Sequence, residues 1–313
     1  MAQTQIADLV GPNPGALANV VNKTFAAKNS LITSGVAVGG PEVDLLMTGG
    51  SYIQALNFVN KVDTTQFNYS SDDYDQKGAT GKLTASPYMA LRHDINWGWT
   101  YTDLVRLVTK YDVKGGVTGA VPLYLSEVSE NMAVAAMNGA LATTEELTLG
   151  EVTDTFSLDA LIDAGATMAD PRARKIIYGS RKTIAKMQKL NKNAYQPASE
   201  TGLAFDVWAN HFVIQTEEFG DTRAIVGTEG ALAFGTGLVP GTIGMETQRD
   251  INAGNGGGGE ILRVRLSIVA SPQGFSYKGP AKPGLAGLAN SANWELTETD
   301  LSNIGFRAIN FAA

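Results

Sequence analysis

The sequence predicts an α+β fold in which long extended segments and one long helix dominate. Two segments, at residues 51–62 and 83–95, alternate in side-chain character as strands do. Apolar residues recur at helical spacing over residues 121–142, and short strand candidates then alternate with turns up to a last strand at 306–311. This mixture of elements is typical of α+β proteins.

The composition of the 313-residue chain is that of a folded protein with few reactive side chains. Hydrophobic residues make up 44% of it, which supplies a sizeable core, and the length allows one or two domains. The chain has no cysteine, which excludes disulfides and thiolate sites, and its only histidines are His93 and His211. Its 35 glycines exceed the usual share of about 7%. This balance argues against an enzyme and favours a protein made for contacts.

The first 45 residues lack sustained periodicity and are interrupted by glycines and prolines. Because such a segment buries little of its own surface, we expect an arm that lies on another surface. The N-terminus has no basic region and no long apolar run, which argues against a secretory signal. No window approaches the roughly 18 apolar residues of a membrane span, so we expect no membrane partner.

The two extended segments are separated by residues 63–82, which are polar and poor in aliphatic side chains. Strands joined in this way make an extended hairpin, and residues 51–62 alone would reach roughly 40 Å. An isolated two-stranded ribbon is marginal in water, so this excursion needs a packing partner. We infer that the partner is another chain; a hairpin folded back on its own domain is the alternative.

The middle of this excursion carries five charged residues that we assign to contacts between subunits. The three acidic residues resemble the start of a calcium-binding loop. Counted from Asp73, however, the fifth loop position is Lys77, and the twelfth, where glutamate is needed, is Thr84. A loose calcium contact between chains stays an alternative, and we predict no cofactor, metal site or catalytic residue. The assigned contact residues are Asp72, Asp73, Asp75, Lys77 and Lys82.

Beyond the second strand the pattern becomes helical. A short helix is expected from Asp103, and Gly115 and Gly116 predict a break before a long helix at residues 121–142, in whose first turn Pro122 fits. The long helix would span about 33 Å, and small residues near its end allow close approach of another element. Its predicted core face consists of Val121, Leu125, Val128, Met132, Ala135 and Gly139.

The remaining chain predicts a compact mixed region. A helix is expected at residues 157–166, a strand at 175–178 leads into a helix at 182–190, and a long strand covers 260–270. The glycine-rich residues 253–259 formally match the dinucleotide spacing G-x-G-x-x-G. A strand follows where that motif requires a helix, so we interpret them as a flexible loop.

No combination of residues indicates catalysis. His93 lies beside Asp94 without a nucleophile elbow, and His211 lies in an apolar strand-like run that is typical of a core histidine. Carboxylate pairs for glycoside hydrolysis depend on tertiary geometry and stay open. The basic residues 172–192 predict a solvated helix face in preference to a phosphate patch. The net charge of −7 argues against general nucleic-acid binding.

The order of these elements resembles the major capsid (coat) protein of tailed bacteriophages, which has the Hong Kong ninety-seven-type fold. The segment NWELTETDLSNIGFRAI at residues 293–309 is similar to the C-terminal segment of many phage coat proteins. Carried onto this chain, the resemblance implies an N-arm at 1–45, an extended E-loop hairpin at 46–98, the spine helix and first part of the P-domain at 99–170, an A-domain at 171–259, and returning strands of the P-domain with the C-terminus at 260–313.

The resemblance implies a structural protein that self-assembles, as hexamers and pentamers, into the icosahedral shell of a virion. The shell would enclose double-stranded DNA without sequence specificity, with a portal protein and a possible decoration protein as partners and the host cytoplasm as the location before assembly. Because the arm begins near Met1, we expect any scaffolding protein to be separate or already removed. No motif singles out a partner for a cross-link from Lys77 or Lys82, so none is predicted.

Glycines at the joints between these parts would let copies of one subunit fit different surroundings. Two other classes stay open as alternatives: the shell protein of an encapsulating compartment that holds cargo, and a carboxylate-based hydrolase. The predicted hinge residues are Gly49, Gly50, Gly115 and Gly116.

Overall fold

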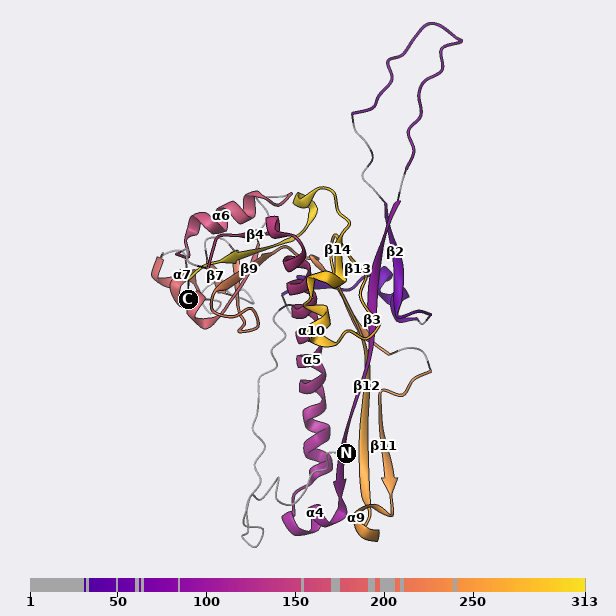
Figure 1. Cartoon of the computed structure of the whole chain (residues 1–313), viewed down its shortest axis with the longest axis vertical. Coiled ribbons are helices and arrows are strands. Elements are labelled where there is room, and N and C mark those ends of the chain that lie inside the picture. The colour runs from indigo at the N-terminus through magenta and orange to yellow at the C-terminus, as the bar shows by residue number, and fades with distance from the viewer. Residues whose placement is uncertain are drawn as a thin grey trace.

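The protein is elongated, with a long helix beside two long strands, a smaller sheet to one side and a loop projecting from one end (Figure 1). Most of the predicted N-arm lies outside the described residues. No helix in the described part of the chain is long and apolar enough to cross a membrane. The computed structural model describes residues 31, 34–48, 50–59, 62, 65–83, 85–152, 155–169, 175–190, 195–197, 206–208, 211–238 and 241–312.

The central sheet is built on two long antiparallel strands. Strand β12 (Gly259–Pro272) pairs with the second half of β3 (Ala85–Thr102), whose first half pairs with β2 (Ile53–Val59). The predicted pair of strands is therefore confirmed, and β3 runs past residue 95 because β12 continues the ladder. The strand order is β1–β10–β12–β3–β2, and the further members are β1 (Ala37–Val38), β10 (Leu232–Gly237) and β11 (Met245–Asp250), which also pairs with β12.

Helix α5 (Val113–Thr143) lies along this sheet and starts before the predicted residue 121. The predicted break at Gly115 and Gly116 is wrong, because both glycines lie inside α5. A Cβ atom would meet the Asp112 carboxylate at Gly115 and the Tyr111 hydroxyl at Gly116, so these positions let two side chains fold over the helix start. Pro122 is likewise in the helix interior and not in its first turn.

The residues of the predicted core face of α5 are enclosed, but burial is not confined to that face, because Ser129, Glu130 and residues 133–137 are buried as well. Val121, Met132, Ala135 and Gly139 are buried, and Leu125 and Val128 are half-buried. The small residue at the end of the helix has the expected effect, since the Leu288 carbonyl and the Trp294 indole pack directly against Gly139. The core therefore forms where α5, the central sheet and the C-terminal segment meet.

A second sheet of seven strands lies beside the upper part of α5 (Figure 1). Helices α6 (Leu158–Ala166) and α7 (Arg181–Leu190) flank it, and both match the expected helices. Its last strand inserts between β4 and β9 rather than lying at an edge. The order is β4 (Thr148–Leu149), β15 (Phe306–Asn310), β9 (Arg223–Gly227), β5 (Ile176–Gly179), β8 (His211–Gln215), β7 (Asp206–Trp208) and β6 (Tyr195–Gln196).

Short elements complete the fold. The glycine-rich residues form a tight turn that ends in β12, with Gly254, Gly256 and Gly258 at positive φ. Glycine adopts this conformation without the steric cost of a side chain, so the motif closes a strand connection. The short elements are α3 (Pro41–Met47), α4 (Asp103–Thr109), α9 (Ala253–Gly256), β13 (Phe275–Tyr277), α10 (Gly284–Leu288), β14 (Trp294–Leu296) and the 3-10 turns η1 (Glu145–Leu147), η2 (Ser291–Asn293) and η3 (Leu301–Asn303).

Candidate interaction surfaces

The loop between β2 and β3 projects from the body of the protein (Figure 1). Residues 65–83 belong to no helix or strand, and every side chain among them is exposed. The loop therefore does not fold back on its own domain. All five residues assigned to subunit contacts lie in this loop and are exposed: Asp72, Asp73, Asp75, Lys77 and Lys82.

One side chain joins the two arms of the loop. The Asn68 amide nitrogen donates to the Ala79 carbonyl at 2.7 Å, and the Asn68 amide oxygen accepts from the Ala79 N–H at 3.2 Å. The pair imitates one rung of an antiparallel ladder and fixes the spacing of the arms where strand pairing has ended.

A compact turn closes the far end of the loop. The Asp73 carboxylate accepts the Asp75 N–H at 3.0 Å, and the Asp73 carbonyl accepts the Gln76 N–H at 3.3 Å. Asp73 thus has a local structural role as an Asx-turn residue. No cluster of three or more His, Cys, Asp or Glu residues that could hold a metal ion occurs within the described chain.

Aromatic side chains are exposed on the same loop. Phe67 is 70% exposed, Tyr69 is 86% exposed and Tyr74 is 98% exposed. The rings of Phe67 and Tyr69 contact each other edge to face, with centroids 5.3 Å apart. Three aromatic rings in water on a projecting loop indicate a surface that another molecule covers.

A buried arginine holds the base of the hairpin. The Arg92 guanidinium donates two hydrogen bonds of 3.1 Å to Asp94 and one of 3.1 Å to the Leu46 carbonyl at the end of α3. Asp94 also accepts from the Ser267 hydroxyl at 2.7 Å, and the Arg92 N–H donates to the Tyr52 carbonyl at 2.8 Å. This network ties α3, β12 and the strands of the hairpin together, and so it sets the direction in which the loop leaves the body.

The predicted hinge glycines have different surroundings. Gly49 lies outside the described residues. Gly50 adopts φ +88 three residues before the start of β2, a conformation that suits a joint between α3 and the hairpin. Gly115 and Gly116 are packed in the first turn of α5, as described above.

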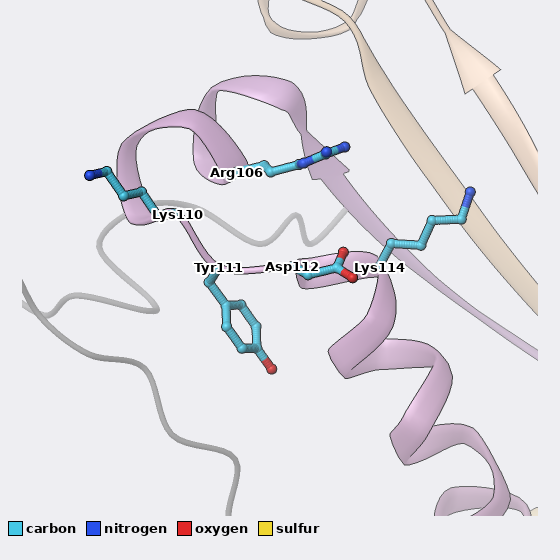
Figure 2. A pocket seen from close by; sticks show the side chains of 5 residues that line it. All are labelled: Arg106, Lys110, Tyr111, Asp112 and Lys114. Atoms are coloured by element: carbon cyan, nitrogen blue, oxygen red, sulfur yellow. The ribbon is translucent and has the colours of Figure 1, made fainter.

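At the opposite end of the protein, α4 and α5 meet at a bend that we call the elbow (residues 103–114; Figures 1 and 2). It borders a shallow cavity of about 530 Å³. Figure 2 shows the side chains spread around this cavity, with the Lys110 ammonium turned away from Lys114. The lining residues are Arg106, Lys110, Tyr111, Asp112 and Lys114.

Ion pairs cross-link the strands next to the elbow. Arg249 binds Asp103 through two hydrogen bonds of 2.9 and 2.5 Å, which lower the pKa of the Asp103 carboxyl. Glu260 accepts from the Tyr101 hydroxyl at 2.6 Å and lies 3.2 Å from the Lys114 ammonium; both hydrogen bonds lower the Glu260 pKa. Burial, together with the hydrogen bond to Glu260, raises the pKa of the Tyr101 hydroxyl. Asp103 and Glu260 are therefore charged and paired with cations, whereas Asp112, which lines the cavity, forms no salt bridge in the described part of the chain.

The two histidines are held apart in different sheets. Burial lowers the pKa of His93 to about 4 although Asp94 acts against this shift, and the Asp94 carboxylate is bound by Arg92 and Ser267. The His211 Nδ1 atom accepts the Lys175 N–H at 3.1 Å, and the side chain is half-buried rather than part of the core. Within the described residues, neither histidine faces a nucleophile with which it forms a catalytic pair.

Sequence reasoning missed the residues that fix the architecture through tertiary contacts. Arg92, Asn68 and the elbow carry no local motif. Arg307 is 1% exposed, and its guanidinium donates to the carbonyls of Leu301, Ile304 and Thr167. The only signal for Arg307 in the sequence was that a charged residue lies inside an otherwise apolar strand. That signal does not identify the residues to which it donates hydrogen bonds.

Among known proteins, no family model and no curated protein matches this chain. Solved structures do. The capsid of Ralstonia phage GP4 matches with a TM-score of 0.62 at 10% identity, over 100% of this chain and 99% of that chain. The capsid of the native GTA particle matches with a TM-score of 0.57 at 12% identity, over 100% of both chains. A structure from Microbacterium phage Oxtober96 matches with a TM-score of 0.54 at 11% identity, over 99% of this chain and 100% of that chain.

Two of these matches cover 100% of this chain. The protein therefore has a phage capsid fold. More particularly, it is the tailed-phage major capsid fold, and the fold expected from the order of elements in the sequence is confirmed.

Proposed function

We propose that this protein is the major capsid protein of a tailed phage, which self-assembles into the icosahedral shell around a double-stranded DNA genome. One observation carries the proposal: a chain with a phage capsid fold projects a loop in which every side chain of residues 65–83 is exposed, three aromatic rings among them. Such a loop is stable and useful when another copy of the subunit covers it.

The resemblance supports further partners for this role. Copies of the chain would form hexamers and pentamers, with a portal protein, a scaffolding protein and a decoration protein as associates. The net charge of −7 suits packaged DNA that is enclosed without a specific grip. The protein would be in the host cytoplasm before assembly and in the virion afterwards.

We also propose a structural rather than an enzymatic role. In the described chain, one histidine is buried with a lowered pKa and the other accepts a backbone N–H. The solved structures that match this chain are capsids of a phage and of the GTA particle, which favours the capsid role over a carboxylate-based hydrolase and over a cargo compartment. The two alternatives are therefore not retained.

Assembly of the purified protein tests the proposal. Size-exclusion chromatography followed by negative-stain microscopy should reveal shells or capsomer rings under assembly conditions. A chain lacking residues 64–81 should fold with the same melting temperature and form none, because the lost contacts lie between copies. A full-length chain that stays monomeric under all assembly conditions would overturn the function. A deletion variant that cannot fold would place the segment in the core instead.

A further inference from the structure

The glycine-rich turn between β11 and β12 contains an asparagine in an uncommon conformation. Asn255 adopts φ +57 and ψ +45, and Gly256 follows it at φ +84. Both residues are exposed. Positive φ is sparsely populated by residues other than glycine, although asparagine tolerates it better than most. Asn255 can therefore leave this conformation at little cost.

Little in the turn holds the Asn255 side chain or the nitrogen that follows it. Within the described residues the Asn255 amide makes no hydrogen bond. The Gly256 N–H donates a single long bond of 3.3 Å to the Asn252 carbonyl. A Cβ atom at Gly256 would meet only open space, and glycines continue to residue 259. The backbone can therefore rotate about ψ of Asn255 and bring the Gly256 nitrogen towards the side-chain carbon Cγ.

These two groups can react with each other, because neighbouring groups in one chain meet at a high effective concentration. The Gly256 nitrogen forms a bond to Cγ of Asn255, and the bond from Cγ to the side-chain nitrogen breaks. The Gly256 proton leaves with that nitrogen as ammonia, so a five-membered succinimide ring remains. Water then opens the ring. Addition at Cγ gives aspartate, whereas addition at the backbone carbonyl carbon gives isoaspartate, in which the chain runs through the former side chain.

A second Asn–Gly pair in the chain provides a comparison. Asn138 and Gly139 lie inside α5, where the Leu288 carbonyl and the Trp294 indole pack against Gly139. The Asn138 amide oxygen accepts from the Arg223 guanidinium at 3.5 Å. Because the helix and this packing fix the backbone, the Gly139 nitrogen cannot approach Cγ of Asn138 without local unfolding. The same dipeptide is therefore held in one region and mobile enough to react in the other.

We propose that Asn255 is a modification site at which the folded protein deamidates itself, so that aspartate and isoaspartate accumulate with time. The inference goes beyond the proposed function and does not depend on it, since it needs only the turn and water. Each event adds one negative charge to a chain whose net charge is −7. Alkaline conditions should accelerate the reaction, because loss of the Gly256 proton makes the nitrogen a better nucleophile.

The modification acts on the elbow, because the turn that contains α9 supports the start of α4 (Figure 1). The Gly258 carbonyl accepts the Asp103 N–H at 3.0 Å. A Cβ atom at Gly258 would meet the Arg249 guanidinium and the Asp103 carboxylate, so the turn packs directly against this ion pair. Isoaspartate lengthens the backbone of the turn by one carbon and so shifts Gly258 relative to Asp103. Aspartate adds charge without lengthening the chain.

Peptide mapping by mass spectrometry tests the proposal on the full-length protein, incubated folded at alkaline pH. Asn255 should convert at least about tenfold faster than Asn138, which corresponds to about 1.4 kcal/mol in activation free energy. In protein unfolded in urea the two sites should convert at similar rates, which would assign the difference to the fold. Equal rates in the folded protein would overturn the proposal, as would an Asn255 that reacts only after unfolding. Neither result depends on whether the protein forms particles.

Two variants separate the chemistry from its effect on the elbow. Asn255→Gly removes the reacting amide and suits the positive φ, so this protein should release no ammonia from the turn. Asn255→Asp, freshly prepared, carries the product charge on an unaltered backbone. Hydrogen exchange at the Asp103 N–H should be several-fold faster in the incubated original protein than in either variant, because only isoaspartate shifts the acceptor at Gly258. Equal exchange in the incubated original protein and in Asn255→Gly would overturn the effect on the elbow.

Discussion

The projecting loop and helix α5 differ in where their shape comes from. In α5, Met132, Ala136 and Ala140 are enclosed by neighbours from the same chain, and Gly139 is fitted against Trp294. In the loop, Asn68 and Asp73 supply local bonds, while the aromatic rings remain in water. The difference teaches that one region is formed by folding and the other is completed by association. The same kind of substitution should therefore have opposite consequences in the two regions.

The largest effect on folding is expected at the core face of α5. Met132 is 7% exposed, and Met132→Asp would bury an unpaired carboxylate there. The free energy of unfolding should fall by about 3–5 kcal/mol in urea denaturation. Met245→Asp is the control. Because Met245 is 49% exposed, this substitution should change the free energy of unfolding by less than about 0.5 kcal/mol. Equal melting of the two variants would refute the assigned core face.

An effect of about 3 kcal/mol is expected from His93 as the pH falls. In the unfolded chain His93 takes up a proton near pH 6.5, whereas burial keeps it neutral in the folded chain down to about pH 4. The unfolded state therefore binds more protons in this interval, so stability decreases as the pH falls from about 6.5 to about 4. The effect is absent above this range.

The control for this pH dependence is His93→Phe, which keeps a ring at the position and removes the titration. Carboxylates also titrate in acid, so the informative quantity is the difference between the unfolding free energies of the two proteins. That difference should change with pH between about 6.5 and about 4. Parallel curves for the two proteins would show that His93 binds protons equally in the folded and unfolded states, so that burial does not lower its pKa.

Much of the fold was predictable because local periodicity records it. Strand β12 and helices α6 and α7 were expected within a few residues, since each alternates or repeats over its own length. The start of α5 was not predicted correctly, because the consecutive glycines Gly115 and Gly116 are typical of a break before a helix. Their neighbours Tyr111 and Asp112 fill the space over them, which is a tertiary fact.

The candidate surfaces were predictable only in part, for the same reason. The polar composition of the loop and its five charged residues stand out in the sequence. The joining of its arms by Asn68 depends on Ala79, eleven residues away, and the clamp of Arg92 depends on α3 and β12. The elbow became visible only when α4 was placed with its aliphatic side outward. Contacts between distant residues leave no periodic signal.

A smaller effect on folding is expected from Asn68→Ala. The two hydrogen bonds to Ala79 are exposed, so the free energy of unfolding should change by less than about 0.5 kcal/mol. The arms of the loop would lose their fixed spacing, and ordering the loop on assembly would then cost more conformational entropy. Particle yield at limiting protein concentration should fall. Asn68→Asp retains the bond from the Ala79 N–H and should have an intermediate yield.

The smallest effect on folding is expected from Tyr74→Ser, at the most exposed aromatic side chain of the loop. Since Tyr74 is 98% exposed, the melting temperature of the monomer should not change. Tyr277→Ser, the same substitution at a tyrosine that is 1% exposed and packed edge to face on Trp294, should cost several kcal/mol. For assembly, the order of the two effects reverses once only folded molecules are compared. Tyr74→Ser should then lower the particle yield more than Tyr277→Ser, because an aromatic contact between copies is lost. A Tyr74→Ser protein that melts early would mean that the loop is stabilised within its own chain, and the distinction between a folded region and an associating one would then fail.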